Sequence, residues 1–309
     1  MPQISLLIPC YNAAPYLPRL CENIAALTTP FDEILFYDDG STDETLQVAN
    51  SFGIDIFRAE ENHGPGYARN RLAERAKADW IHFHDADDLM HPDFVSTMLA
   101  PTNEEADVLL CHAEWLDEEH RGRQVHWRYD SHVLKTNPLE SLLCHPSSAL
   151  NAVYRKETFL RVGGFREDIH CWEDADLNVR LAHAGASFLV VDETLVTALR
   201  HGRGASAQRA MCLECRMKLL REYGSLFGEK YNFILGQEGE KVAREYLSLD
   251  DTEGVLSALH LCCEFGYQIP HTKNFLLKAL GRFLPPLWSF SLQESVRKLN
   301  SRYSCTFQK

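Results

Sequence analysis

The sequence lacks a hydrophobic run long enough to cross a membrane, and no basic segment precedes an apolar run at its start. A membrane-spanning helix needs about 20 mostly apolar residues, so we expect no transmembrane segment, and no signal peptide is visible. Positive charge is also scarce, since 31 Lys and Arg stand against 44 Asp and Glu, a net charge of −13. An acidic chain is a poor partner for a nucleic-acid backbone. We therefore expect a cytoplasmic protein without a nucleic-acid partner, and leave open peripheral contact with the inner face of a membrane.

Several motifs of nucleotide and serine chemistry are missing as well. The chain has no G-x-x-x-x-G-K-S/T and no G-x-S-x-G, which removes support for a phosphate-binding P-loop and for a hydrolase serine. The stretch Gly64-Pro65-Gly66-Tyr67-Ala68-Arg69 has Arg where a dinucleotide-binding motif has its third glycine, and it follows a loop. Nicotinamide and flavin cofactors are therefore not expected.

Ten cysteines are present, but they are scattered and most lie among apolar residues. This pattern favours buried free thiols in a reducing compartment. The lone pair Cys212 and Cys215 has only Cys262-Cys263 as a distant second pair, so zinc is not indicated.

Short apolar segments alternate with amphipathic segments through the first part of the chain. The expected strands are 4–8, 33–37, 54–57, 80–84 and 108–111, and the expected helices are 15–27, 42–52, 67–77 and 92–99. Ser41 with Glu44 has the spacing of a helix-capping box. His82 and His84, on the fourth strand, are expected in the core or behind the site rather than as ligands. This alternation predicts a parallel sheet with helices on both faces.

Polar or acidic residues follow three of the first four strands, at Tyr11-Asn12, Asp38-Asp39 and Asp85-Ala86-Asp87-Asp88. Any one turn could be a loop that bonds its own backbone, and the last could be a solvated turn before the helix near residue 92. However, parallel strands bring their carboxyl ends to one edge, where such sheets bind ligands. Asp85 and Asp87, two apart on an extended chain, point the same way and favour a hard cation.

The middle of the chain is less regular, and the end is helical only. We expect a hairpin or loop over 114–129, helices over 138–144 and 156–162, and strands over 188–191 and 194–199. Residues 1–206 are predicted to form the sheet domain and 207–309 a helical region of unknown role. Its segment 275–292 is compatible with a core helix or an interfacial one, and Pro285 and Pro286 favour the core.

A second acidic cluster opens the helix predicted over 173–184. Asp174 shares a face with Leu177 and Leu181, so it leans toward the interior, near the positive end of the helix dipole. Such a carboxylate is either a helix cap or a general base. Asp176 and Arg180 are expected on the other side as an exposed pair.

Six short motifs follow one another along the chain between residues 8 and 177. They are Ile8-Pro9-Cys10-Tyr11-Asn12, Asp38-Asp39-Gly40-Ser41-Thr42-Asp43, Asn62-His63-Gly64 with Ala68-Arg69-Asn70, Asp85-Ala86-Asp87-Asp88, Gly163-Gly164-Phe165 and Trp172-Glu173-Asp174-Ala175-Asp176-Leu177. In this order and with these gaps, over about residues 1–206, the chain resembles the family 2 inverting glycosyltransferases. The resemblance implies a GT-A fold, a Rossmann-like and mostly parallel sheet, and a divalent cation, Mn²⁺ or Mg²⁺. It also implies transfer of a sugar from a nucleotide-diphosphate sugar, by family habit a UDP-sugar, to a hydroxyl of a glycan or lipid-linked acceptor.

The resemblance assigns a role to each matching position. The residues expected at the nucleotide are Pro9, Tyr11, Asn12, Asp39, Arg69, Asp85 and Ala86, with Asp39 accepting the N–H of the base. Asp87 and His201 are expected at the metal, and Arg203 at the diphosphate. Asp174 is expected to be the base, with Glu173 beside it in the catalytic pair. Trp172 is expected to stack on an acceptor sugar, and is equally compatible with a core aromatic.

Two other functions compete with this one. A nucleotidyltransferase has a similar sheet and metal chemistry, but it should carry a glycine-rich, basic loop after the first strand, where this chain has Pro9-Cys10-Tyr11-Asn12. A non-catalytic nucleotide-binding or assembly module would not need Asp39, Asp87 and Asp174 together. Glycosyl transfer therefore remains the favoured prediction.

Overall fold

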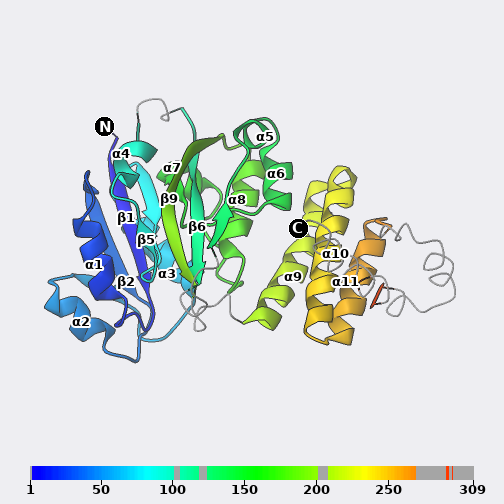
Figure 1. The fold of residues 1–309 in the computed structure, drawn as a ribbon, viewed down its shortest axis with the longest axis horizontal. Helices are drawn as coiled ribbons and strands as arrows, with labels where there is room; N and C mark the ends of the chain where they lie inside the picture. The colour runs from blue at the N-terminus through cyan, green and yellow to red at the C-terminus, as the bar shows by residue number, and fades with distance from the viewer. Residues whose placement is uncertain are drawn as a thin grey trace, which may run out of the picture. The chain divides into compact units, whose positions relative to one another are not determined.

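The structure, a computed structural model, describes residues 2–100, 105–117, 124–200 and 208–268, together with 290, 291 and 294. The chain divides into two compact units, Met1–Gln208 and Arg209–Lys309. The first unit contains a sheet with helices packed on it, and the described residues of the second unit lie mostly in helices (Figure 1).

One sheet forms the centre of the first unit, and the described residues contribute nine strands to it. They are β1 (Ile4–Cys10), β2 (Glu33–Asp38), β3 (Ile56–Arg58), β4 (Trp80–Phe83), β5 (Leu89–Met90), β6 (Val108–Asp117), β7 (Gln124–Trp127), β8 (Ala152–Arg155) and β9 (Phe188–Arg200). Their spatial order is β3-β2-β1-β4-β8-β6-β9-β5, with β7 paired to β6. Parallel pairing joins β3, β2, β1 and β4, and also β6 and β9. The predicted α/β class is confirmed, and the sheet is mixed because β5, β7 and β8 pair antiparallel.

Helices cover both faces of this sheet. They are α1 (Leu17–Ala25), α2 (Thr45–Ser51), α3 (Pro65–Arg75), α4 (Phe94–Met98), α5 (Ser131–Thr136), α6 (Pro138–Cys144), α7 (Lys156–Arg161) and α8 (Glu173–His183). Because strand side chains alternate, Leu6 and Ile8 of β1 lie in one buried cluster with residues of α1 and α4. Helix α3 contributes nothing to that cluster and packs on β1 and β2 from the opposite face (Figure 1).

The carboxyl ends of β2, β1 and β4 lie side by side, as predicted. Cys10, the last residue of β1, is in register with Asp38, the last residue of β2. The amide of Asp39 donates to the carbonyl of Cys10 at 2.8 Å, and the amide of His84 donates to the carbonyl of Leu7 at 3.0 Å. The sheet therefore brings the three polar turns to one edge, and the non-local strand pairing fixes their order.

Three local predictions are corrected by longer-range contacts. The Ser41 capping box does not form, because α2 begins at Thr45 and the Ser41 hydroxyl instead accepts the Asn12 amide at 2.8 Å. The two strands expected over 188–199 are one strand, since the polar interruption is absorbed by register shifts against β6 near His112. The region 114–129 includes the expected hairpin, with β7 antiparallel to β6.

The cysteines agree only in part with the prediction of buried free thiols. The free thiols are Cys10, Cys111 and Cys262, which are buried, Cys21, Cys144 and Cys215, which are partly buried, and Cys263, which is exposed. Cys171 and Cys212 are disulfide-bonded, so the prediction is wrong for these two. Spacing along the chain does not reveal which cysteines form disulfides.

The second unit is helical, as expected from the sequence. It contains α9 (Arg209–Phe227), the 3-10 turn η3 (Glu229–Tyr231), α10 (Asn232–Ser248) and α11 (Thr252–Glu264). A Cβ atom on Gly236 of α10 would overlap the side chain of Tyr267, so glycine allows a close approach there. Within the predicted segment 275–292, only residues 290 and 291 belong to the described part of the chain. None of the described helices is both long and apolar enough to span a membrane.

His82 and His84 are fully buried behind the carboxyl edge, as predicted. The ring of His82 lies against Phe94, with centroids 4.4 Å apart, and its Nδ1 is 2.8 Å from the carbonyl oxygen of Ala152, so Nδ1 carries the proton. Burial lowers the pKa of His82 to about 3 and that of His84 to about 4. Both rings are therefore neutral in the folded protein at neutral pH.

These histidines predict a loss of stability in mild acid. The unfolded chain takes up protons near the ordinary histidine pKa, whereas the folded chain does not, so the free energy of unfolding falls as pH drops below about 6.5. Each histidine should contribute a loss of about 1.4 kcal/mol at about pH 5.5. We expect His82→Phe to reduce the difference in unfolding free energy between about pH 7.5 and pH 5.5 by about that amount. Urea unfolding at the two pH values measures it, and an unchanged difference would show that His82 takes up its proton in the folded protein as readily as in the unfolded chain.

Candidate functional site

Asp39 lies at the turn after β2 and is 3% exposed. Its Oδ2 accepts the backbone N–H groups of His63, at 3.0 Å, and Gly64, at 2.8 Å. Gly64, with φ of 96°, precedes α3, so Asp39 is bound to the start of that helix. Among the described residues Oδ1 accepts no hydrogen bond, and His63 Nδ1 is 3.7 Å from it. Burial raises the pKa of Asp39 although the two N–H donors oppose the shift. A buried carboxylate oxygen is therefore left for an N–H donor.

The turn after β1 is fastened to the turn after β2. Asn12 has a left-handed backbone, with φ of 51°, and its Oδ1 accepts the Thr42 amide at 2.9 Å while its own amide donates to Ser41. Tyr11 beside it is 51% exposed, and Pro9 is partly buried. Asn12 thus holds the two turns together, and Tyr11 presents an exposed ring next to them.

Arg69 of α3 joins two acidic clusters that are far apart in the sequence. Its Nη2 donates to Asp85 Oδ1 at 2.7 Å, and its Nη1 donates to Glu173 Oε1 at 2.6 Å. Burial alone would raise the pKa of Asp85, but the Arg69 guanidinium outweighs it and holds that pKa below its usual value. Burial raises the pKa of Glu173 despite the same guanidinium. The motif order pointed to these residues, but no local pattern indicated that they form one ion-paired group.

The turn between β4 and β5 carries Ala86, Asp87 and Asp88. Ala86 is buried and Asp87 is half-buried; the carbonyl oxygen of Asp87 accepts Arg19 Nη2 at 2.6 Å. Asp88 is buried, and its Oδ1 accepts the amide of Leu199 at 2.8 Å. Burial, followed by the charges of Asp87 and Asp85, raises the pKa of Asp88 well above its usual value. Asp88 thus ties this turn to the end of β9, a role that sequence reasoning missed.

Asp174 is the second residue of α8 and is partly buried. Its Oδ1 accepts the amide of Ala175 at 2.7 Å, and its carboxylate also interacts with the Ser148 hydroxyl. The N-cap position belongs to Trp172, which has no capping side-chain bond and a left-handed backbone with φ of 70°. A bulky residue in this conformation carries backbone strain. Burial raises the pKa of Asp174, and Arg69 opposes that shift. A carboxylate with a raised pKa near the carboxyl edge of the sheet can take up a proton.

One prediction about α8 is wrong. Asp176 and Arg180 form an ion pair, with Nε 2.7 Å from Oδ2, but the pair is not exposed, because Asp176 is 1% exposed. The Arg180 guanidinium also donates to the carbonyls of Val162 and Gly164. The turn after α7 therefore covers this face of the helix, which helical periodicity alone does not reveal.

The predicted cation ligands are described only in part. His201 and Arg203 lie outside the described residues. Within those residues, His, Cys, Asp and Glu side chains do not form a cluster of three or more suited to a metal ion. The carboxylates of Asp85 and Asp87 are the hard oxygen donors that Mg²⁺ and Mn²⁺ prefer, and one or two such groups with substrate phosphates are a common arrangement. The donor set present therefore fits a divalent cation shared with a diphosphate.

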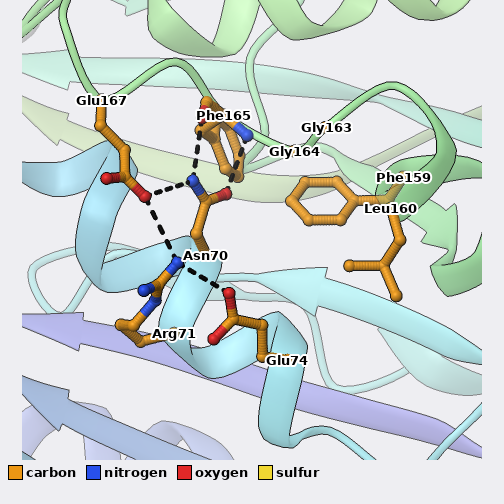
Figure 2. Close-up of a pocket in the computed structure, with 9 residues that line it drawn as sticks. All are labelled: Asn70, Arg71, Glu74, Phe159, Leu160, Gly163, Gly164, Phe165 and Glu167. Carbon is orange, nitrogen blue, oxygen red and sulfur yellow. Dashed lines mark hydrogen bonds and ion pairs between the residues drawn. The ribbon is translucent and has the colours of Figure 1, made fainter.

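A cavity of about 340 Å³ lies between α3 and the turn that follows α7 (Figure 2). Figure 2 shows the Asn70 amide between Phe165 and Glu167, and Arg71 between Glu167 and Glu74. Asn70 Nδ2 donates to the Phe165 carbonyl at 2.9 Å, and its Oδ1 accepts the Phe165 amide at 2.8 Å. None of the predicted site residues lines this cavity. The two bonds to Phe165 show that Asn70 fastens the loop before α8 to helix α3.

Comparison with known proteins identifies the family. The model of glycosyl transferase family 2 matches residues 5–163, which is more than half of the chain. The chain belongs to glycosyl transferase family 2. The predicted resemblance is thereby confirmed, although the matched range ends before Trp172, Glu173 and Asp174.

Relatives of this family 2 chain include bacterial glycosyltransferases. It is 32% identical over 114 residues to the putative glycosyltransferase EpsH of Bacillus subtilis, covering 36% of this chain and 33% of the relative. It is 25% identical over 240 residues to chondroitin synthase of Escherichia coli, covering 75% and 34%. The chain thus spans about a third of the length of these two relatives.

Solved structures share the fold at low identity. Staphylococcus aureus TarS 1-349 in complex with UDP-GlcNAc matches with a TM-score of 0.59 and 19% identity, covering 87% of this chain and 93% of that one. The mannosyltransferase PcManGT from Pyrobaculum calidifontis, in complex with GDP-Man and Mn²⁺, matches with a TM-score of 0.55 and 18% identity, covering 96% and 87%. At this identity the likeness establishes the fold alone, which is of the GT-A type.

Proposed function

We propose that this protein is an inverting, metal-dependent glycosyltransferase. It would move a hexosyl-type sugar from a nucleotide-diphosphate sugar, a UDP-sugar first among the candidates, to a hydroxyl of a glycan or lipid-linked acceptor. Family membership supports sugar transfer, and the relatives bound to UDP-GlcNAc and to GDP-Man with Mn²⁺ support the donor class. The observation that carries the proposal is the linked group Asp39, Arg69, Asp85 and Glu173-Asp174, which α3 connects along the carboxyl edge of the sheet.

The donor would bind along the turns after β1, β2 and β4. Asp39 Oδ1, which accepts no hydrogen bond from the described residues, would accept the N–H of the base, while Tyr11, Pro9 and Asn12 would contact the nucleoside. Asp85 and Ala86 would lie at the nucleotide, with Asp85 near the ribose or the metal. Asp87, with His201, would hold the divalent cation, which when bound stabilises negative charge on the departing diphosphate as a Lewis acid.

The reaction is a single displacement with Asp174 as the base. Its carboxylate takes the proton of the acceptor hydroxyl while that oxygen forms a bond to the anomeric carbon. The bond from the anomeric carbon to the diphosphate oxygen breaks at the same time, and the electron pair leaves with the diphosphate. Attack from the face opposite the leaving group inverts the anomeric configuration. Trp172 would stack on the acceptor ring, and Arg203 would contact the diphosphate.

A thermal-shift screen of UDP-, GDP- and dTDP-sugars, with and without Mn²⁺, tests the donor class. Ligand that binds the native state at about 100 times its dissociation constant adds about 2.7 kcal/mol to the stability, so we expect a rise of several degrees in the unfolding temperature. Asp39→Asn is the matched variant, because it keeps an acceptor for His63 and Gly64 but turns an N–H toward the base. We expect it to remove the shift. If no nucleotide sugar raises the unfolding temperature under either condition, the proposed function is wrong.

The location and the acceptor belong to the same proposal. A cytoplasmic enzyme with peripheral contact to a membrane fits a lipid-linked acceptor, and a soluble glycan fits the same chemistry at Asp174. The role of residues 207–309 is not assigned by this proposal. Transfer assays with glycan and lipid-linked acceptors, after the donor is known, distinguish the two classes.

A further inference from the structure

Arg69 is a buried cation held from three sides by elements that are far apart in the sequence. Its side chain is 8% exposed. One terminal nitrogen contacts Asp85, which follows β4, and the other contacts Glu173, which opens α8. The ring of Phe165 lies 5.4 Å from the guanidinium carbon. The group is therefore fixed by the protein itself.

One contact of Arg69 is on the side of the proposed sugar donor, and the other is on the side of the proposed base. Asp85 lies in the turn assigned to the nucleotide sugar, and Glu173 precedes the proposed base, Asp174. The planar guanidinium donates in two directions at once, which a single lysine ammonium does not reproduce. Arg69 thus spans the donor turn and the start of the helix that carries the base.

Without this cation, the three nearby carboxylates would repel one another. Asp85, Glu173 and Asp174 all lie close enough to interact electrostatically with Arg69. Unpaired buried charges are costly, so the start of α8 and the β4–β5 turn should move apart. A displacement of about 1 Å at a reacting centre costs about 100-fold in rate.

We propose that Arg69 is a positioning residue, which sets the distance between the donor turn and Asp174 by bridging Asp85 and Glu173. The inference rests on the proposed function and deepens it. It differs from the expectation that Arg69 contacts the nucleotide directly, since each terminal nitrogen donates to a carboxylate of the protein, and the nitrogen without a partner among the described residues is the buried Nε. A positioning role predicts a loss in kcat, whereas a nucleotide contact predicts a rise in the donor KM.

The test compares variants of the full chain at saturating and limiting donor. We expect Arg69→Met to lower kcat roughly 100-fold, with a donor KM within about threefold of the wild type. Arg69→Lys should fold and restore only part of kcat, because it retains the charge without the two-way geometry. Arg71→Met is the matched control, since Arg71, two residues on, pairs with Glu74 and Glu167 away from these carboxylates, and it should leave kcat unchanged.

A double-mutant cycle tests the bridge itself. In the Arg69→Met background, Glu173→Gln should cost much less than it does in the wild type, since the repulsive charge is then removed. Additive effects would overturn the proposal, as would an Arg69→Lys variant with wild-type kcat or a raised donor KM at unchanged kcat. If Arg69→Met does not fold, the Arg69→Lys result decides alone. Absence of transfer by the wild type with every donor tested would instead refute the proposed function.

Discussion

Asp174→Asn is expected to lower kcat for sugar transfer by roughly 10²–10⁴-fold, the usual contribution of a general base. The amide cannot take the proton of the acceptor hydroxyl, but it can still accept the Ala175 amide that Asp174 Oδ1 binds at 2.7 Å. The start of α8 should therefore persist, and the affinity for the nucleotide sugar should change little. Steady-state rates at saturating donor, with calorimetric titration of the nucleotide sugar, measure the two quantities separately.

The pH dependence of kcat provides a second test of Asp174 as the base. Burial raises the pKa of Asp174, and only the ionised carboxylate acts as a base. We therefore expect kcat to fall as pH drops through a value above the ordinary aspartate pKa of about 3.9, and we expect Asp174→Asn to lose this acidic limb. Asp55→Asn, at an exposed carboxylate of the same unit, is the control and should leave kcat unchanged. Equal losses of kcat and donor affinity, with a lower unfolding temperature, would mean that Asp174 only stabilises the helix start.

The turns of the candidate site can be predicted from local pattern. A short apolar run predicts a strand, and the polar or acidic residues directly after it mark the carboxyl end of that strand. The alternation of apolar strands and helices located β1, β2 and β4, and their parallel pairing placed Asn12, Asp39 and Asp85 along one edge. Order along the chain predicts the rest of the candidate site, since the motif of the family resemblance includes the Glu173-Asp174 pair. The strand predictions are confirmed because each strand pattern depends on residues only a few positions apart, whereas the roles assigned to Asn12, Asp39, Asp85 and Asp174 stay predictions.

The predictions that failed depend on partners distant in the sequence. The Ser41 hydroxyl bonds to Asn12 across 29 positions instead of capping its own helix. The Asp176–Arg180 pair is buried because Arg180 also binds carbonyls 16 and 18 positions earlier. The bridge from Arg69 to Glu173 spans 104 positions. Periodicity and capping rules contain no term for such contacts, so the electrostatics of the site could not be derived from the sequence.

Asp87→Asn is expected to abolish metal-dependent transfer while the fold persists. Stabilisation of the leaving diphosphate by a divalent cation is worth several kcal/mol, so we expect kcat/KM at saturating Mn²⁺ to fall by roughly 10²–10⁴-fold. Asn at position 87 keeps the size of the side chain and the backbone carbonyl that accepts Arg19 Nη2, so we expect the fold to persist. Rates measured across a Mn²⁺ titration, with circular dichroism of both proteins, check the two parts of this expectation.

The neighbouring residue supplies the contrast that makes this test specific. Asp88 is buried, and burial with the charges of Asp87 and Asp85 favours its neutral form. Asn at position 88 keeps an oxygen for the Leu199 amide, so Asp88→Asn should retain most of the activity and the same dependence on Mn²⁺. A carboxylate that binds the cation and a carboxylate that fastens β9 thus respond differently to the same substitution. If Asp87→Asn remains active without divalent ions, or if both variants lose activity equally, the assignment of the cation to Asp87 is wrong.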